Sequence, residues 1–358
     1  MSYSEESNLD LQDDISTSDE ELLKFIEERK VRIKIFGAGG AGSNTINRIM
    51  RDPLSTKVRL IALNTDAAHL RIILAHNKVV LGRNLTKGRG SGADPHVGEE
   101  AAKESDRDIQ KFIDGTSIAF VTTGLGGGTG TGSAPYIASK ARKSGILTIS
   151  IVTWPFADEG EKRTLNAKDG LEKLLYYSDC VIVIPNDKLL ELVPDVPIQK
   201  AFKLADEIIT KAISGISDLI TKPGLINLDF NDLVRVTKDS GMAMFGLGLS
   251  SAPLGQRINE ATEQALNSPF LDVDLSTSKA VIVSIQGGKD LMLDEAAASL
   301  ELVKRRVGER AEIIMGTSLD SEMNGKVQIM VLATGVKTKF DVYPHPGKGY
   351  GGDIDSIS

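Results

Sequence analysis

The chain has 358 residues, of which 41% are hydrophobic and 25% are charged, and it is long enough to form two hydrophobic cores. A single cysteine, Cys180, excludes an intramolecular disulfide framework, and its apolar neighbours favour a buried structural thiol. Residues 1–30 hold ten Asp or Glu and three Lys or Arg, so the entire net charge of −7 belongs to this segment. The rest of the chain is neutral, which argues against a nucleic acid-binding protein.

No apolar stretch approaches the roughly 18 residues that a membrane-spanning helix requires, and the acidic N-terminus lacks the pattern of a signal peptide. We therefore expect a cytoplasmic protein without direct membrane insertion. Residues 1–30 are expected to form an acidic N-terminal extension without a specific function, disordered up to a short helix near Glu20–Lys30.

From Val31 onward, short apolar segments alternate with helical segments. Strands are predicted at Val31–Phe36, Val58–Leu63, Val79–Leu81, Ser117–Thr122, Leu147–Val152 and Cys180–Ile184, and helices at Gly98–Ile113 and Pro135–Ser144. Apolar strands that alternate with helices are typical of a parallel sheet covered on both faces. Residues 31–196 are therefore expected to form an α/β domain with a Rossmann-like parallel sheet.

A long amphipathic helix is predicted next, and we assign residues 197–222 to it because Pro197 lies near its first turn and Pro223 follows its end. Beyond it, strands are predicted at Lys279–Gln286, Ala311–Met315 and Lys326–Gly335, and helices at Leu254–Asn267 and Leu293–Val307. This pattern indicates a smaller α+β domain over residues 223–340. Residues 341–358 are rich in Pro, Gly and small polar residues, which predicts a flexible tail.

Two glycine-rich loops each separate a strand from a helix. The first, Gly37–Asn44, also matches the dinucleotide fingerprint Gly-x-Gly-x-x-Gly, and Asp66 follows the second strand, where an acid could bind the ribose of NAD. The second, Gly124–Ser133, contains six glycines and three hydroxyl side chains. Two such loops on one sheet suit a nucleoside triphosphate better than a dinucleotide, which needs only one.

A third glycine segment, Gly88–Pro95, could close over a γ-phosphate or could be a plain surface loop. The sequence Gly-x-x-x-x-Gly-Lys-Ser/Thr does not occur, so the chain is not a P-loop NTPase.

The segment Gly-Gly-Gly-Thr-Gly-Thr-Gly at 126–132 resembles the signature of the tubulin/FtsZ family, and the resemblance extends from about Val31 to Gly335. Other segments similar to the family's loops are Asn64–Ala67, Pro155–Arg163, Ile184–Asp187 and Gly224–Asp232, the last resembling its so-called synergy loop. The resemblance implies a GTP-binding domain, a long central helix and a C-terminal domain. It also implies a GTPase that binds GTP or GDP with Mg²⁺ and polymerises head-to-tail into the filaments of a cell-division ring.

The resemblance also implies which residues bind the nucleotide. The expected GTP-binding residues are Gly39, Gly40, Ala41, Gly42, Asn44, Asp66, Gly90, Ser91, Gly92, Ala93, Gly126, Gly127, Gly128, Thr129, Gly130, Thr131, Pro155, Glu159, Arg163, Asn186, Phe202 and Asp206. Of these, Asn44 and Asn186 are expected near the base. Glu159 and Arg163 are expected at the ribose, although their spacing alone would indicate an ordinary helix ion pair.

Selectivity for guanine has a physical argument as well. Phe202 and Asp206 are spaced i, i+4 on the long helix, so both project from one face. The ring can stack on the base, and the carboxylate can accept hydrogen bonds from N1–H and the amino group of guanine. Adenine has an acceptor at N1 and lacks that amino group, so the carboxylate would repel it. Without the family pattern, Phe202 would be read as a core residue and Asp206 as a solvated one.

Candidate catalytic residues lie far from the glycine loops. The four histidines have no metal-ligand spacing and are read as surface or loop residues, and no nucleophile–base pair is apparent. Asn227, Asp229 and Asp232 follow a helix of about 24 residues, which spans about 36 Å. They cannot easily reach the nucleotide of their own subunit, but those of a head-to-tail neighbour can. The resemblance implies this shared site, and the other interpretation is that Asp229 and Asp232 cap a helix at Phe230–Thr237.

The ends of the chain resemble those of archaeal-type members. Bacterial members carry a long linker and a C-terminal peptide that docks membrane-tethering partners. Here the short apolar and acidic segment Gly352–Asp355 could bind a membrane-anchoring adaptor at the mid-cell division site, or could be a featureless end.

Other functions fit parts of the sequence. An NAD(P)-dependent oxidoreductase would leave the second glycine loop and the residues Asn227–Asp232 without a role. A noncatalytic or regulatory tubulin-like protein would bind GTP without treadmilling; a nonhydrolysing member could dispense with Asn227, Asp229 and Asp232, and their presence argues against it. A tubulin-like filament protein without a role in division is a further alternative that the sequence leaves open.

Overall fold

The computed structural model describes residues 30–192, 197–222, 224–226, 228–337 and 340. The chain divides into two units at Arg32, and the fold described below is that of the second unit, from Arg32 onward. The acidic extension before Lys30, the tail 341–358 and the candidate catalytic residue Asn227 lie outside the described residues.

The second unit is built on one ten-stranded sheet with the strand order β3-β2-β1-β4-β5-β6-β7-β10-β8-β9. Its strands are β1 Ile33–Ala38, β2 Arg59–Asn64, β3 Asn77–Val80, β4 Ile118–Gly124, β5 Leu147–Trp154, β6 Cys180–Pro185, β7 Gly241–Ser250, β8 Ala280–Gly287, β9 Glu312–Leu319 and β10 Val327–Thr334. Strands β1 to β6 are all parallel, and their order reverses between β1 and β4. Ligands of doubly wound sheets bind at this kind of reversal, outside the carboxyl ends of the strands. Both glycine-rich loops begin there.

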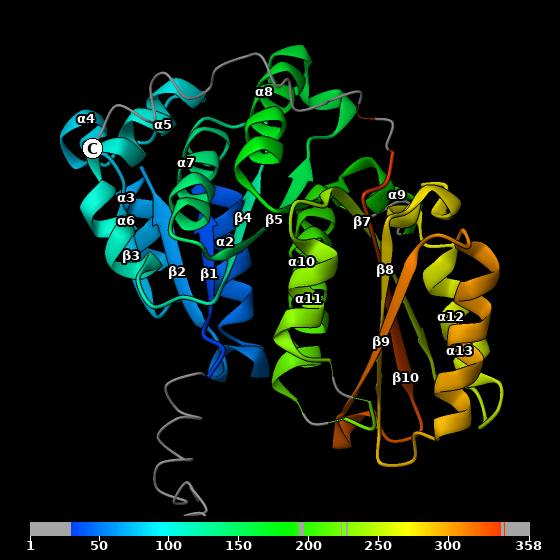
Figure 1. The fold of residues 1–358 in the computed structure, drawn as a ribbon. Helices are drawn as coiled ribbons and strands as arrows, with labels where there is room; N and C mark the ends of the chain where they lie inside the picture. The colour runs from blue at the N-terminus through cyan, green and yellow to red at the C-terminus, as the bar shows by residue number, and fades with distance from the viewer. Residues whose placement is uncertain (1–29, 193–196, 223, 227, 338–339, 341–358) are drawn as a thin grey trace, which may run out of the picture. The chain divides into compact units, whose positions relative to one another are not determined.

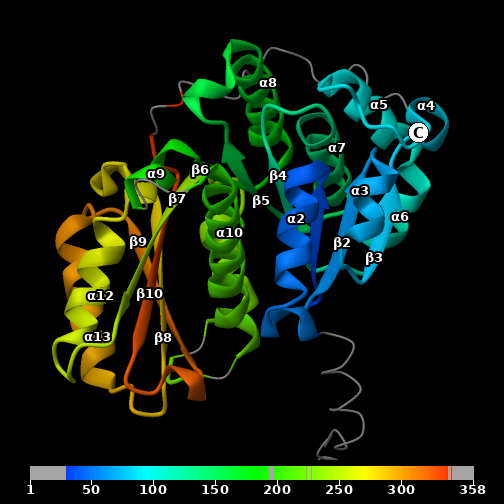
Figure 2. The same cartoon turned by 180° about the vertical axis from the view of Figure 1, so that it is seen from behind.

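Helices cover this parallel part of the sheet, with α2 on one face and α7 and α8 on the other (Figures 1 and 2). The helices are α2 Gly39–Ile49, α3 Ala67–Ile72, α4 Arg83–Thr86, α5 Pro95–Glu104, α6 Asp106–Ile113, α7 Thr129–Lys143, α8 Glu161–Tyr177 and α9 Asp187–Leu192. The predicted helix Gly98–Ile113 is therefore two helices that meet at Ser105. The predicted helix at Pro135 starts earlier, at Thr129, because α7 begins inside the second glycine loop.

The long helix α10, Ile198–Thr221, lies between the two parts of the sheet (Figure 1). It contacts α2 and β5 on one side and β8 and β9 on the other. The remaining helices are α11 Phe230–Thr237, α12 Arg257–Leu266 and α13 Leu293–Arg306, and α12 packs on β7 and β10. Short 3₁₀ turns lie at Pro53–Thr56, Ala157–Glu159, Pro269–Leu271, Leu275–Thr277 and Ser321–Met323.

Among the described strands, β7 is the one that sequence patterns did not predict. Its glycines weaken the signal of a strand, since glycine is normally unfavourable inside one. In the structure, a Cβ atom on Gly246 would lie 1.9 Å from the carbonyl oxygen of Ala265, and one on Gly248 would lie 1.9 Å from that of Ala261. The glycines therefore allow α12 to pack directly on the backbone of β7. Strand β7 pairs in parallel with β6 and antiparallel with β10, which joins both halves into one sheet.

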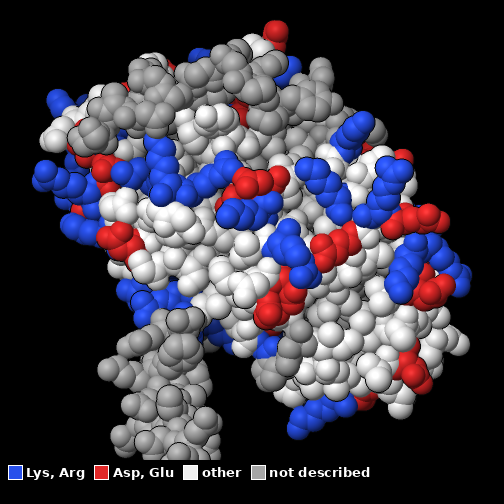
Figure 3. Space-filling view, viewed as in Figure 1, with Lys and Arg blue, Asp and Glu red and all other residues white. Residues whose placement is uncertain are grey.

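Two hydrophobic cores stabilise this arrangement. One lies among β1 to β6 and their helices, and the other lies among β7 to β10, α12 and α13. Acidic and basic side chains are interspersed on the face shown in Figure 3, as expected for a neutral body. Within the described residues, no helix combines the length and the apolar character needed to cross a membrane.

Candidate functional site

A cavity of about 710 Å³ lies at the carboxyl ends of the parallel strands, beside the first turns of α10. This volume is typical of a site for a small molecule or cofactor. Most of the residues expected to bind nucleotide line it: Gly40, Ala41, Asn44, Asp66, Gly90, Ser91, Gly92, Ala93, Gly127, Gly128, Thr129, Gly130, Glu159, Arg163, Asn186, Phe202 and Asp206. The expected residues that do not line it are Gly39, Gly42, Gly126, Thr131 and Pro155.

Four of those five residues shape the loops. A Cβ atom on Gly39 would lie 2.6 Å from the backbone nitrogen of Gly130, so the two glycine loops touch only because Gly39 has no side chain. Likewise, a Cβ atom on Gly42 would lie 2.4 Å from the carbonyl oxygen of Thr122. The hydroxyl of Thr131 accepts a hydrogen bond of 3.0 Å from the amide of Gly126, which adopts a φ of +97°. The loops are thus held against each other around one cavity.

Both glycine loops lead into helix N-termini without a side-chain cap. Neither Ala38 before α2 nor Gly128 before α7 offers a side-chain hydrogen bond to the first turn. The first amides of a helix have no partner within the helix, and the helix dipole places partial positive charge there. Two such N-termini at one cavity form a site for a ligand with several anionic groups.

The third glycine segment is docked on the second loop. The hydroxyl of Ser91 lies 3.0 Å from that of Thr129, which lies 2.6 Å from that of Thr65. The amide of Gly90 donates to the carbonyl oxygen of Thr65 at 3.2 Å. A Cβ atom on Gly128 would lie 2.3 Å from the Ser91 hydroxyl oxygen. The segment therefore borders the cavity, and its closure over a γ-phosphate stays a prediction.

The far end of the cavity combines an aromatic ring with unsatisfied polar groups. Phe202 is 44% exposed although it is a large hydrophobic residue, and its ring meets that of Phe156 edge-on at 5.6 Å. The hydroxyl of Thr45 donates to Asp206 at 2.8 Å, and burial raises the pKa of Asp206 to about 6. Asn186 is 4% exposed, and no described residue hydrogen-bonds its side-chain oxygen. A flat base with hydrogen-bond donors would satisfy all three residues.

Glu159 and Arg163 form the i, i+4 ion pair that their spacing indicates, and both line the cavity. The carboxylate of Glu159 also accepts a hydrogen bond of 2.9 Å from the amide of Phe156, which fixes its position. Arg163 is about half-exposed. Both side chains can therefore bind a polar group of the ligand while the ion pair between them stays formed.

Sequence reasoning misplaced His69, which was read as a surface or loop residue. It lies on α3, lines the cavity, and contacts the side chains of Asn64 and Asn44 at 3.1 Å each. Asp66 caps the same helix by accepting from the amide of His69 at 2.9 Å. The other lining residues outside the expected set are Thr45, Asn64, Thr123, Gly124, Leu125, Thr153, Ala205 and Ile209. The last two follow Phe202 by three and seven residues, so the helical period could have revealed them.

Asp229 and Asp232 lie away from this cavity and cap α11. Asp229 accepts a hydrogen bond of 2.8 Å from the amide of Asp232, and Asp232 accepts one of 3.3 Å from the amide of Asp229. Between Asp206 and the end of α10 at Thr221 there are fifteen helical steps, or about 22 Å. The capping interpretation is thus confirmed, and both carboxylates follow the end of α10 that is remote from the cavity.

Comparisons with known proteins agree with this geometry. Residues 32–194 match the model of the "Tubulin/FtsZ family, GTPase domain", and residues 241–337 match that of the "FtsZ family, C-terminal domain". The chain is 52% identical to "Cell division protein FtsZ 1" of Pyrococcus horikoshii over 325 residues, which cover 91% of this chain and 86% of the relative. It is 48% identical to the protein of the same name from Thermococcus kodakarensis, with 94% and 90% covered. A solved structure titled "FtsZ dimer, empty (M. jannaschii)" superposes with a TM-score of 0.83 at 43% identity, covering 90% of this chain and 93% of that one.

Proposed function

The chain belongs to the tubulin/FtsZ family and is an archaeal FtsZ-type GTPase of cell division, and from this premise we propose that its active site is divided between two subunits. One subunit binds GTP in the cavity between the glycine loops and Phe202. Its head-to-tail neighbour supplies Asp229 and Asp232. The observation that carries the proposal is the length of α10, which separates these carboxylates from the cavity of their own subunit. Membership in a GTPase family argues against the oxidoreductase, and the presence of Asn227, Asp229 and Asp232 argues against a non-hydrolysing regulatory protein.

In the binding subunit, the amides of the two glycine loops and the N-termini of α2 and α7 bind the phosphates. Phe202 stacks on the base, and the carboxylate of Asp206 accepts from N1–H and the amino group of guanine. Asn186 lines the same cavity, and its unpartnered side-chain oxygen is a further acceptor. Glu159 and Arg163 contact the ribose, and Ser91 with its neighbours lies along the phosphates. The pKa of Asp206 supports its role, because a donor pair offsets the cost of ionising a buried carboxylate.

In the neighbouring subunit, the capping contacts leave part of each carboxylate for catalysis. Only Oδ1 of Asp229 has a hydrogen-bond partner among the described residues, which leaves Oδ2 to hold the attacking water. Asp232 uses one oxygen for the cap and the other for an ion pair of 3.0 Å with Arg235. We assign Asp229 the position closest to the water and Asp232 an electrostatic role beside it. Asn227 is proposed to hold the nucleotide and the loop in register.

The residues of the cavity fit a magnesium ion that is bound mainly through the nucleotide. The described residues contain no group of three or more His, Cys, Asp or Glu side chains that could form a metal cage. Mg²⁺ commonly uses phosphate oxygens, waters and one or two carboxylates instead. Asp66 is the carboxylate of the cavity that is assigned to neither base nor ribose. When bound, Mg²⁺ would offset the negative charge of the phosphates.

Assembly follows from the divided site, since a head-to-tail interface that does not close produces a filament. We propose that this filament forms in the cytoplasm at the mid-cell division site and that an adaptor binds the tail 341–358. For the domains we propose an extension at 1–30, a GTP-binding domain at 31–196, the central helix at 197–222 and a C-terminal domain at 223–340 that includes the synergy loop 224–232. The two hydrophobic cores, one on each side of α10, support this division.

The proposal is tested by measuring GTP hydrolysis and sedimentation over a range of protein concentrations. The specific activity is expected to rise steeply at the concentration at which polymer first sediments. Activity per subunit that is independent of concentration would contradict a shared site.

Substitutions at Asp229 separate catalysis from capping. Asn retains a capping oxygen, so Asp229→Asn is expected to bind GTP, to polymerise and to hydrolyse very slowly, whereas Asp229→Ala also loses about 1 kcal/mol of stability. Asp274→Asn is the matched control, because Asp274 caps a 3₁₀ turn at a distant site by accepting from Ser276 at 3.0 Å. Wild-type hydrolysis by Asp229→Asn would refute the catalytic role.

A further inference from the structure

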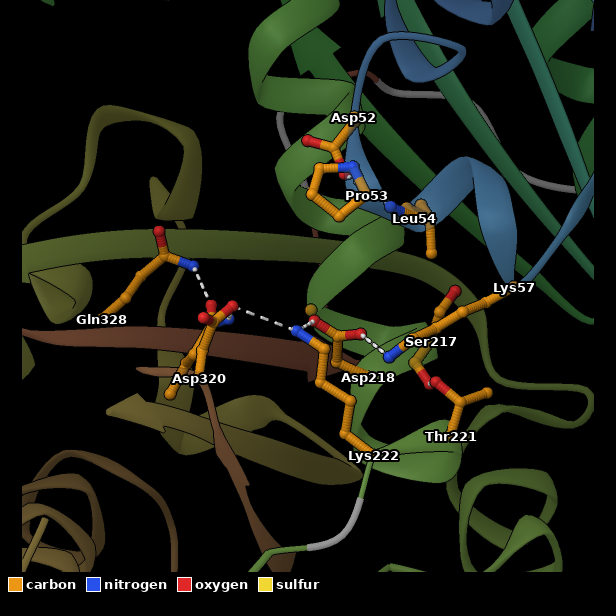
Figure 4. A network of polar contacts seen from close by, with 12 residues as sticks. Asp52, Pro53, Leu54, Lys57, Ser217, Asp218, Thr221, Lys222, Asp320 and Gln328 are labelled. Atoms are coloured by element: carbon orange, nitrogen blue, oxygen red, sulfur yellow. Dashed lines mark hydrogen bonds and ion pairs between the residues drawn. The ribbon is translucent and has the colours of Figure 1, made fainter. Parts of the chain in front are cut away.

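A chain of ion pairs joins three distant parts of the sequence at the lower end of α10 (Figure 4). The ammonium group of Lys222 lies 2.7 Å from the carboxylate of Asp218, one turn earlier, and 3.4 Å from that of Asp320, which directly follows β9. Asp218 in turn lies 3.7 Å from the ammonium group of Lys57, in the connection between α2 and β2. The chain thus runs from the GTP-binding part through the central helix to the C-terminal sheet. Gln286 of β8 also donates to Asp320, at 3.4 Å.

The centre of this chain is shielded from solvent. The side chains of Asp218 and Lys222 are 10% and 18% exposed. Burial alone would lower the pKa of Lys222, but Asp218 and then Asp320 more than offset it and the pKa is raised. Opposite charges attract one another more strongly when they are shielded from water, whereas exposed ion pairs contribute little to stability. Removal of Lys222 would also leave Asp320 without this cation and Asp218 with only the more distant ammonium group of Lys57, at 3.7 Å.

Lys222 caps the C-terminal end of α10, two residues before the synergy loop 224–232. A Cβ atom on Gly224 would lie 1.8 Å from the carbonyl oxygen of Thr317 in β9. Thr317 then binds Ile226 twice, since its hydroxyl accepts from the amide of Ile226 and its amide donates to the carbonyl oxygen of Ile226, each at 2.8 Å. Strand β9 therefore holds the loop directly, and Asp320 links the end of that strand to Lys222.

We infer that Lys222 is a positioning residue for GTP hydrolysis, which fixes the synergy loop of its own subunit relative to the nucleotide of the neighbouring subunit. The inference rests on the proposed divided site, because only there does the position of the loop decide the rate. Two ion pairs, which we call the two arms, connect α10 to the rest of the molecule: Lys57 links Asp218 to the GTP-binding part, and Asp320 links Lys222 to the end of β9. A displacement of about 1 Å at a reacting group can lower a rate about 100-fold, so a change in the loop anchor is sufficient to be measured.

The test replaces the charge while keeping the aliphatic stem, in Lys222→Met of the full chain. We expect kcat per polymerised subunit to fall about tenfold, with the KM for GTP and the affinity of the monomer for GTP unchanged. Lys222→Arg should recover most of kcat. Lys111→Met is the matched control, since Lys111 lies in the last turn of α6 and forms an exposed i, i+3 pair with Asp108 at 3.1 Å. A wild-type kcat in folded Lys222→Met, or equal losses in the control, would overturn the inference.

Two further variants keep the test decisive if Lys222→Met fails to fold. Asp320→Asn and Lys57→Met each remove one arm, and Asp320→Asn is expected to lower kcat more, because Asp320 connects to the strand that holds the loop. Wild-type kcat in both would overturn the inference. Asp229→Asn identifies which idea fails: if it hydrolyses GTP normally, the divided site is wrong, whereas if it is inactive while Lys222→Met is normal, only the positioning role is wrong.

Discussion

The substitution Asp206→Asn tests whether the buried carboxylate of Asp206 destabilises the nucleotide-free protein and is needed to bind the nucleotide. Burial raises the pKa of Asp206 from its ordinary value of 3.8 to about 6, despite the hydrogen bond from Thr45 and the charge of Arg48. The difference corresponds to about 3 kcal/mol of free energy that the ionised side chain costs the folded protein at pH 8. Asn has the same shape and still accepts from Thr45. We therefore expect nucleotide-free Asp206→Asn to be more stable than the wild type at pH 8, with a free energy of unfolding up to about 3 kcal/mol higher.

The dependence on pH has a definite sign. Because the folded pKa is raised, the favourable contribution of Asp206 is fully present below pH 3.8 and is lost as the pH rises through 6. At pH 5 the difference in free energy of unfolding between the variant and the wild type should be about 1.4 kcal/mol smaller than at pH 8. Urea unfolding of both proteins without nucleotide, at pH 5 and pH 8, measures this difference. A variant that is less stable than the wild type at pH 8, or a gap that does not change with pH, would refute the reasoning.

The same variant has a defined effect on binding. The carboxylate must be ionised to accept both donors of guanine, so wild-type affinity for GTP should fall by about tenfold from pH 8 to pH 5, because about one site in ten remains ionised one pH unit below the pKa. Asp206→Asn should bind GTP weakly at both pH values. Its amide offers one acceptor and one donor, which matches N1–H and the 2-oxo group of xanthine, so xanthosine triphosphate should bind the variant better than GTP does. Unchanged preference for GTP would place the base elsewhere.

Three other outcomes follow from the structure. Phe202→Ala should weaken GTP binding about tenfold in a fluorescence titration, since stacking of an aromatic ring on a base contributes about 1–3 kcal/mol. Gly246→Ala should lower the free energy of unfolding by about 1–3 kcal/mol in urea, because its Cβ atom would lie 1.9 Å from the carbonyl oxygen of Ala265; an unchanged midpoint would contradict the packing of α12. Cys180, whose pKa is raised by burial to about 12, should react with a thiol reagent at pH 8 only when the protein unfolds, and rapid labelling of the folded protein would contradict its burial.

Sequence patterns predicted the parallel half of the fold and the long helix, because apolar strands and amphipathic helices carry their own periodic signals. They did not predict strand β7. The glycines that let α12 approach this strand, Gly246 and Gly248, also weaken its strand signal. The division of the helix at Ser105 was also missed. Ser105 accepts from the amide of Gly82 at 3.0 Å, a tertiary contact that leaves no local signal.

The candidate site was predictable where function imposes a local pattern and less so elsewhere. The glycine runs, together with the resemblance to the tubulin/FtsZ family, identified most of the residues that line the cavity. His69 was missed because one histidine on a short helix has no local signature, and its role depends on Asn44 from another element. Lys57, Asp218 and Asp320 meet only after folding, so no spacing in the chain could have indicated their contact.

The position of Asp229 beyond the remote end of α10 has a consequence for the two tips of a filament. In a filament with the proposed divided site, the last subunit at one tip has a cavity that no neighbour completes, so its GTP should persist. At the other tip, Asp229 and Asp232 face solvent without a substrate. Hydrolysis is therefore expected to begin one subunit inside the first tip, and every filament should carry a triphosphate-bearing cap there, whose lifetime depends on subunit arrival.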